Sequence, residues 1–530
     1  RVLGHSPVSA VKTARRSTGK RAAALALTAA LVVGMTLPAF ALPWYIEDGD
    51  ISISAGESGN KVVQNGEEKA ANDTDTVIKS NYPSTASEHT VTINAEEGKT
   101  VNVTLDNVNI DTRTRKTSEA AVSVTGSGNT NIELNGNNTL TSGGWDAGLE
   151  HNKETDSEGN ETSGTLTITD TDKNGSLTAT GGRNGGAGIG GRNIENAGKI
   201  EITGGTITAV GAEDGAGIGG GGGGGGIGGD ADITISGGTI TAIGGQSEQI
   251  GGAGIGGGGY GGSADITITG DAVIKEAIGG NGAAGIGSGM GNPWTSEPLI
   301  TVGNVTIEGN AKVDSAVGGA NGAAGIGGGT FGIGNVIIRG NAQIGNATGG
   351  DEGAGIGGGV LGTGDVTIEG NVTIENAQGG AGAAGIGGGA ETQPDTEDTR
   401  NKVSIKSTEA GSPNITAKGG GVLDENAPLA GAAAIGSGSV ADGATEVKSD
   451  ITVEGKVTIN ATGGGDVAIG DSNGETRFSG LQVGTTITRR NAKGDDVSQP
   501  GDVVREQAPT ETEAAEAPST GSVEVERPVT

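Results

Sequence analysis

The candidate residues for hydrolysis or metal binding in this sequence are aspartates at the start of short strands. Enzymes that cleave polysaccharides need paired carboxylates, often with calcium and a basic group at the bond that breaks. Asp230, Asp232 and Asp265 lie between glycine-rich loops and strand-like runs, and no Lys or Arg recurs beside them. Turns favour aspartate at such boundaries, and the three histidines are too scattered for a zinc site. The sequence therefore predicts no catalytic residue, no metal ligand and no cofactor.

Aromatic residues in glycine-rich loops offer a different chemistry, the stacking of a sugar ring on a flat amphipathic face. Trp294 lies in "GSGMGNPWTSEP", Trp145 in "GGWDAGLE" and Tyr260 in "GGGGYGG". The alternative is that each tryptophan folds back as a local lid, and the sequence favours neither interpretation. Trp294, Trp145 and Tyr260 are the predicted ligand-binding residues.

Glycine dominates the composition. The 530 residues include 110 glycines and no cysteine, only 2% are aromatic, and the net charge is −31. An ordinary globular core needs more large apolar side chains. The chain is therefore either disordered or a repeat fold that needs glycine at fixed positions. Its negative charge argues against nucleic acid and anionic membrane surfaces as partners.

Residues 1–41 have the pattern of a secretory signal peptide. Basic "KTARRSTGKR" precedes apolar "AAALALTAALVVGMTL", and "AFA" ends at Ala41. The apolar run is short for a membrane span. We therefore expect cleavage, no stable membrane span afterwards, and a secreted or cell-surface protein. Without cysteine, such a protein cannot use disulfides for its stability.

One isoleucine embedded in glycine returns through the chain, as in "NGAAGIGGG" at 321–329. Its shortest intervals are about 29 to 31 residues, a period typical of solenoids and other repeat folds. Between copies lie strand-like runs such as "DVTIEG" and "NVTIENAQGG", in which apolar and polar residues alternate as in half-buried strands. The repeated residues are Ile189, Ile218, Ile255, Ile286, Ile326, Ile356, Ile386, Ile435 and Ile469.

Three short strands per period predict an all-β fold, a parallel β-helix of about eleven coils over residues 101–475. Burial of five or six apolar side chains, at about 1.5–3 kcal/mol each, cannot offset the ordering of a whole coil at about 1–2 kcal/mol per residue. Coils must therefore stack. The outward residues of the second strand are expected to form one polar column: Thr167, Glu201, Thr234, Thr267, Thr306, Ile337, Thr367, Ser404 and Thr452.

The glycines of the repeat have two interpretations. Strand alternation directs Ala324 and Ile326 into the core, and it leaves Gly325 and Gly327 pointing outward as a strip of bare backbone. In the first interpretation these glycines are structural, because they allow positive φ angles and close approach of the backbone. In the second, the bare strip is an interaction surface.

The repeat also resembles a known protein family. "SGGTITA…GG…GAGIGGG" and the upstream "VNVTLDNVNI…AAVSVTGSGNTNIELNGNNTLTSGG" resemble secreted, glycine-rich bacterial surface proteins described as carbohydrate-binding-domain proteins. The resemblance covers about residues 100 to 475. It implies a pectate-lyase-like right-handed parallel β-helix, an extracellular location, and binding rather than catalysis. It provides no sugar-contact motif that transfers to named residues.

The two ends of the mature chain read differently from the repeats. Residues 42–100 contain "DISIS" and "HTVTINA", strand-like runs that predict an N-terminal β cap over the open end of the stack. Residues 476–530 are acidic and rich in Pro, Thr and Glu, which predicts a disordered tail.

The function expected from the sequence is non-enzymatic. We expect an adhesin-like surface protein that binds glycans or other surface molecules through one edge or face of the β-helix. The first alternative is a purely structural rod that acts as a spacer or associates with itself. The second is a polysaccharide lyase or hydrolase, for which the sequence offers no acid/base pair.

Overall fold

The computed structural model describes residues 43–505, except residue 225 and residues 292–298, 392–399, 423–430, 440–446 and 472–473. The chain divides into two units, residues 1–42 and 43–530. The predicted signal peptide and residues 506–530 lie outside the described residues. In the described part, no helix has the length and apolar character that a membrane crossing requires.

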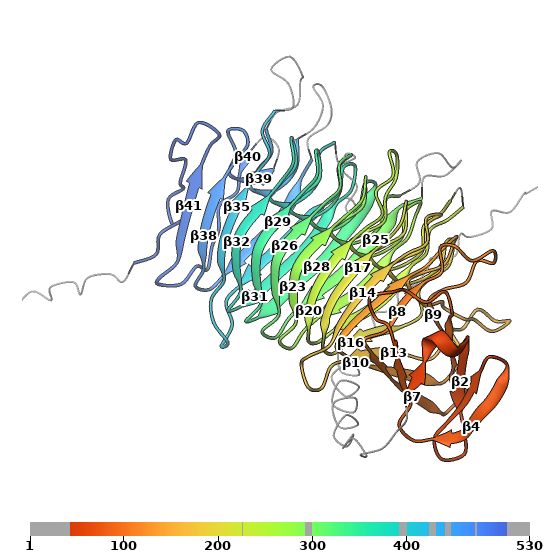
Figure 1. The fold of residues 1–530 in the computed structure, drawn as a ribbon. Coiled ribbons are helices and arrows are strands. Elements are labelled where there is room, and N and C mark those ends of the chain that lie inside the picture. Colours follow the sequence, from red (N-terminus) through yellow and green to blue (C-terminus); the bar gives the residue numbers. More distant parts are fainter. Residues whose placement is uncertain are drawn as a thin grey trace, which may run out of the picture. The chain divides into compact units, whose positions relative to one another are not determined.

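Residues 43–505 form a parallel β-helix with three strands per coil (Figure 1), as predicted. Three sheets of 13, 12 and 16 strands run along the stack, and each coil contributes one strand to each sheet. Helical structure in the described residues is limited to one short 3-10 turn, η1 (Ile46–Asp48). We call the three sheets A, C and B in that order.

Sheet A is parallel throughout, and β7 to β37 supply eleven of its strands, in agreement with the predicted number of coils. Its strands, in spatial order, are β1 (Trp44–Tyr45), β5 (Val77–Lys79), β7 (Thr100–Asp106), β10 (Asn129–Asn135), β13 (Leu166–Thr169), β16 (Ile200–Ile202), β19 (Ala231–Ile235), β22 (Ala264–Ile268), β25 (Thr301–Ile307), β28 (Gly332–Gly340), β31 (Gly364–Gly370), β34 (Asn401–Lys406) and β37 (Ser449–Glu454).

Sheet C follows sheet A in every coil. Its strands are β8 (Asn109–Asp111), β11 (Asn137–Thr141), β14 (Ser176–Thr180), β17 (Thr206–Val210), β20 (Thr239–Ile243), β23 (Val273–Ile278), β26 (Lys312–Val317), β29 (Gln343–Thr348), β32 (Thr373–Gln378), β35 (Asn414–Lys418), β38 (Thr458–Thr462) and β41 (Thr486–Arg490).

Sheet B contains the repeated isoleucines, and most of its strands are only two residues long. They are β4 (Glu67–Asp73), β3 (Asn60–Gln64), β2 (Ile51–Ala55), β6 (Val91–Asn94), β9 (Val122–Thr125), β12 (Leu149–His151), β15 (Ile189–Gly190), β18 (Ile218–Gly219), β21 (Ile255–Gly256), β24 (Ile286–Gly287), β27 (Ile326–Gly327), β30 (Ile356–Gly357), β33 (Ile386–Gly387), β36 (Ile435–Gly436), β39 (Ile469–Asp471) and β40 (Gly474–Glu475).

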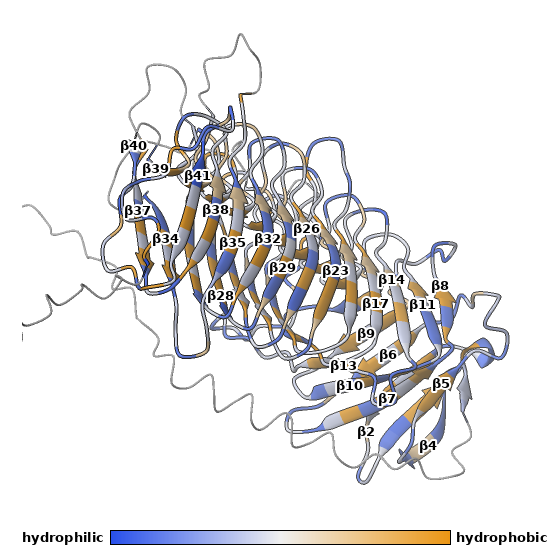
Figure 2. Cartoon of the chain, turned by 90° about the vertical axis from the view of Figure 1, so that its left-hand side faces the viewer, coloured by the Kyte–Doolittle hydropathy of each residue, from blue (hydrophilic) through white to orange (hydrophobic). Residues whose placement is uncertain are grey.

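Side chains alternate between core and surface along the strands of sheets A and C. Figure 2 shows the result as apolar bands that recur at the same level from strand to strand. The predicted polar column on sheet A is confirmed: from Thr167 to Thr452, each of its residues is the register partner of the next. The column includes Ile337, which is 39% exposed.

The glycine motif forms a re-entrant loop rather than a flat strand. In the coil of Ile326, the Ala324 N–H donates to the Gly328 carbonyl at 2.9 Å, so the chain folds back on itself around a fully buried isoleucine. Along the stack, the Ile326 N–H donates to the Gly355 carbonyl of the next coil at 3.0 Å. Each coil thus inserts its isoleucine into the core between two closely spaced limbs of backbone.

This geometry corrects the expected strip of outward-facing glycine, because Gly325 and Gly327 are both buried. A Cβ on Gly325 would lie 2.7 Å from the Thr348 backbone nitrogen, inside the end of sheet C. Gly327 has φ +129° and meets the backbone of Gly357 in the next coil. The structural interpretation of these glycines therefore holds, and they leave no bare strip.

The N-terminal end of the stack is covered by a small antiparallel sheet. β2 pairs antiparallel with β3, β3 pairs antiparallel with β4, and β2 joins β6 in parallel. Because β6 already pairs in parallel with β9, the coil register begins inside the region predicted as a cap. The predicted boundary at residue 100 therefore lies later than the start of the stack.

At the C-terminal end, the prediction of a disordered tail from residue 476 is wrong for residues 476–505. β41 pairs in parallel with β38, and single antiparallel bridges join Thr486 to Val503 and Arg490 to Asp496. Arg489 is fully buried and donates to Asp502 at 2.9 Å and to Glu475 at 2.8 Å. Its guanidinium also lies 5.2 Å from the ring centroid of Phe478. These contacts form a C-terminal cap.

Candidate functional site

The re-entrant loops close on the outer side of the stack, where their two ends meet between coils. In most coils, the residue four positions after the core isoleucine donates its N–H to a carbonyl in the limb that precedes the core residue of the previous coil. Val360 donates to Gly322 at 2.6 Å, and Thr330 donates to Gly282 at 2.8 Å. The next residue along the chain lies at the outer surface in the coils of Ile189, Ile255, Ile326 and Ile356.

Apolar side chains gather at this outer edge over six successive coils. In four coils they occupy the position just described, whereas in the coils of Ile218 and Ile286 they come from later in the loop, and both of these lie beside Gly261, next to Tyr260. We call the six side chains the edge column: Ile194, Ile227, Tyr260, Leu299, Phe331 and Leu361. Ile194 is 56% exposed and Ile227 is 63% exposed, whereas the other four are half-buried. The coils are about 4.8 Å apart, so the column spans about 24 Å. Adjacent exposed apolar groups of this kind mark interaction surfaces.

Four members of the edge column have a left-handed backbone, with φ +64° for Ile194, +66° for Tyr260, +59° for Phe331 and +61° for Leu361. This conformation costs roughly 1–2 kcal/mol for a residue other than glycine, and it is exceptional for bulky side chains. Backbone hydrogen bonds between coils hold it in place, as between the Phe331 N–H and the Val360 carbonyl at 3.0 Å.

Of the three predicted ligand-binding residues, two lie at this edge. Tyr260 is a member of the edge column. Trp145 is 45% exposed, and its carbonyl accepts a hydrogen bond from the Asn193 N–H at 2.9 Å, directly beside Ile194. Trp145 therefore extends the apolar line by one coil. Trp294 lies outside the described residues.

Charged residues at the two ends of the edge column differ in sign. Exposed Arg183 precedes the core isoleucine of the first coil, and Asp351 and Glu352 precede that of the last. Glu391 follows in the coil beyond. Partial burial raises the pKa of Glu352, and the charges of Glu391 and Asp351 raise it further. The acidic end therefore contains carboxylates that repel one another.

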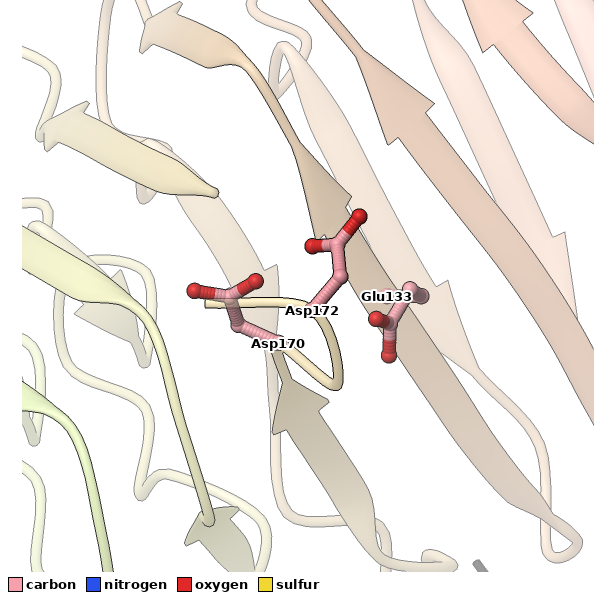
Figure 3. Close-up of side chains that lie close together, drawn as sticks. All are labelled: Glu133, Asp170 and Asp172. Atoms are coloured by element: carbon pink, nitrogen blue, oxygen red, sulfur yellow. The ribbon is translucent and has the colours of Figure 1, made fainter. Parts of the chain in front are cut away.

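A separate carboxylate trio lies where β10 meets the turn that follows β13 (Figure 3). Oxygen atoms of Glu133, Asp170 and Asp172 all lie within 4.8 Å of one another, close enough to hold a metal ion. Calcium prefers oxygen ligands of this kind. The turn itself supplies hydrogen bonds, since the Thr171 N–H donates to Glu133 at 2.6 Å and Asn174 Nδ2 donates to Asp172 at 2.7 Å. Burial, together with Asp172, raises the pKa of Asp170.

The sequence pattern that could have indicated the trio is "DTDKNG" at 170–175, which has the D-x-D-x-N-G spacing of calcium-binding loops. Glu133 comes from the previous coil, so no local pattern could have revealed it. Of the aspartates that were interpreted as turn residues, only Asp230 lies outside a strand, and it accepts a hydrogen bond from the Ser263 N–H of the next coil at 2.8 Å. Asp232 and Asp265 lie within β19 and β22, where they are register partners. Burial raises the pKa of Asp230.

The structure also brings together a carboxyl pair that sequence reasoning missed. Glu150 occupies the position after Leu149 that is glycine in the coils that follow, and burial raises its pKa to about 7, with a further contribution from Asp146. Both carboxyl groups are less than 10% exposed. Glu150 accepts from the Ala147 N–H at 3.3 Å and from Asn152 Nδ2 at 3.0 Å, so the loop itself holds the group.

Comparisons with family models, with curated proteins and with solved structures found no match for this chain.

Proposed function

We propose that this chain is a non-enzymatic, adhesin-like extracellular protein that binds glycans or other surface molecules through the edge column. The observation that carries the proposal is the line of six apolar side chains on one edge of the β-helix, four of them on left-handed backbone. A left-handed conformation costs least with glycine. Bulky apolar residues at such positions therefore favour a role for the side chains themselves.

Among the described residues, the carboxyl pair of Asp146 and Glu150 has the one strongly raised pKa that a general acid would need. Both side chains are almost fully buried, and backbone and amide groups of the same loop already donate to Glu150. A general acid must reach the bond that it cleaves. The enclosure of this pair therefore supports binding rather than cleavage.

The proposal is tested by binding of the full chain to an array of surface glycans and to immobilised surface proteins. We expect the wild-type chain to bind a subset of ligands, and the Tyr260→Gly/Phe331→Gly variant to bind them at least tenfold more weakly. Ile337→Thr is the matched control, because Ile337 is an exposed apolar residue on sheet A, away from the edge. No binding by the wild-type chain, or equal binding by all three proteins, contradicts the proposal.

A further inference from the structure

We propose that the partner of the edge column is a second copy of this chain, packed antiparallel about a two-fold axis between the coils of Ile255 and Ile286. This inference goes beyond the proposed function and shares with it only the edge column as the binding surface. In such a dimer the same surface of each copy is used, and each residue faces its counterpart reflected through the centre of the column.

The apolar residues are arranged symmetrically about that centre. Counted by coil, the antiparallel pairing sets Ile194 of one copy opposite Leu361 of the other, Ile227 opposite Phe331, and Tyr260 opposite Leu299. Every side chain of the column then meets an apolar counterpart. Four of the six are aliphatic, and burial against protein suits these better than stacking on a sugar ring, which requires an aromatic face.

The charges beside the column match in the same register. Arg183 precedes the core isoleucine of the first coil, and Asp351 precedes that of the last, so each arginine faces an aspartate of the second copy. In the second coil, exposed Glu213 faces exposed Asn321, which is uncharged. The two-fold axis therefore pairs opposite charges at both ends and sets no carboxylates opposite each other.

Other alignments lose this match. A parallel alignment sets Arg183 against Arg183 and Asp351 against Asp351. An antiparallel shift by one coil sets Ile194 opposite Glu391 and Glu213 opposite Asp351. A shift in the other direction leaves Arg183 and Asp351 without opposite charges. Like charges that face each other across an interface suppress the parallel pairing and the first shift. The other shift sets Trp145 opposite Leu361 but leaves Arg183 opposite uncharged Asn321, so the two opposite-charge pairs favour the register centred between Ile255 and Ile286.

The first test is the mass of the full chain in solution, measured by sedimentation over a range of concentrations. We expect a reversible monomer–dimer equilibrium for the wild-type chain and at least a tenfold weaker dimer for Ile194→Gly/Phe331→Gly/Leu361→Gly. Glycine is chosen because it suits the left-handed backbone, and circular dichroism checks that the fold is retained. Ile337→Thr should dimerise like the wild type. A monomeric wild-type chain at every concentration overturns the inference.

The second test is charge exchange, which isolates the antiparallel register. Arg183→Asp alone and Asp351→Arg alone should each weaken the dimer at least tenfold, and the double variant Arg183→Asp/Asp351→Arg should recover it. Arg183 and Asp351 of one copy lie five coils apart, so recovery cannot come from contacts within a chain. A dimer that both single variants leave unchanged, or that the double variant fails to recover, excludes this register.

The two proposals fail in different ways. If the wild-type chain is monomeric but loses binding to a glycan or foreign surface protein when Tyr260 and Phe331 are replaced, self-association is overturned and the proposed function stands. If the wild-type chain dimerises and the triple glycine variant does not, the inference holds whatever the array shows. If neither dimerisation nor binding is found, both are overturned.

Discussion

At the scale of single residues, this fold depends on glycines at positions where a Cβ atom would clash with neighbouring backbone. The glycine after each core isoleucine has φ between +129° and +152° in every coil from Gly190 to Gly470. In that conformation, a Cβ would point at the backbone of the next coil or of the terminal hairpin. The sequence pattern alone could establish that these glycines were fixed in position. It could not reveal the re-entrant path, because strand alternation assumes an extended chain.

Replacement of Gly327 by alanine should destabilise the protein strongly. The new Cβ would meet the Gly357 carbonyl, and the backbone at φ +129° suits glycine alone. We expect a loss of about 3 kcal/mol or more in the free energy of unfolding, measured by urea denaturation. Gly98→Ala is the control, because Gly98 has φ +72° but no neighbour within 4 Å. Its loss should stay near 1–2 kcal/mol, and equal losses would contradict the role of coil contact.

Glu150 should make the stability of the protein depend on pH. Its pKa is about 7 in the folded chain, compared with 4.5 for an ordinary glutamate. Because the folded pKa is the higher one, the folded state binds the proton more tightly, and stability falls as pH rises from about 4.5 to 7. The difference corresponds to about 3 kcal/mol.

Glu150→Gln tests this pH dependence by thermal unfolding between pH 4.5 and 8. The substituted side chain is uncharged at every pH, so the stability of the variant should fall much less with rising pH than that of the wild-type chain. Glu97→Gln, at an exposed site, should retain the wild-type profile. A wild-type stability that stays level across this range would contradict the raised pKa of Glu150.

At the scale of elements, the closing loops of four coils each place an outward-facing apolar side chain on a left-handed backbone. Sequence alone indicated Tyr260 and Trp145 as surface aromatics, because each stands out in a glycine-rich loop. Ile194, Phe331 and Leu361 were missed, since they share no local motif and come together only when the coils stack. Their common offset from the core isoleucine is the signal that could have identified them.

Phe331→Gly should be more stable than Phe331→Ala. Both variants remove the ring, but only alanine retains the steric cost of φ +59°. We expect a difference of about 1 kcal/mol in favour of glycine, measured by chemical denaturation. Ile337 provides the control, because it lies within the extended strand β28. At that position, Ile337→Gly should be less stable than Ile337→Ala, by roughly 0.5–1 kcal/mol. The same sign at both positions would contradict the strain at the edge.

At the scale of the whole molecule, periodicity was the most reliable information in the sequence. A repeated isoleucine, a constant interval and alternating strands were sufficient for the three sheets and the number of coils. The ends were predicted less well, because a cap is not periodic. Arg489, in a segment that composition assigned to a tail, is buried through contacts with Glu475 and Asp502 that only the folded chain provides.

Deletion of one complete coil should leave a folded protein. Removal of residues 326–355 joins Gly325 to Ile356, which would then take the place of Ile326 beside Ile286 and keep its own pairing with Ile386. Contacts in a solenoid are mainly between neighbouring coils, so we expect the β-sheet circular dichroism signal per residue to be unchanged. Removal of 326–340 alone would delete the sheet B strand β27 and the sheet A strand β28 of one coil but keep its sheet C strand β29, and it should abolish cooperative unfolding. Equal behaviour of the two deletions would contradict the modular stack.

The two caps determine what kind of assembly the molecule can enter. Open ends of a β-helix would let one copy continue the sheets of the next, and such head-to-tail growth has no natural limit. Here the antiparallel sheet of β2, β3 and β4 lies at one end, and the chain that follows β41 folds back at the other. Contact between copies is thereby directed to their sides. The proposed pairing about a two-fold axis is complete at two copies, so capped ends and a two-fold contact would both limit growth into a fibre.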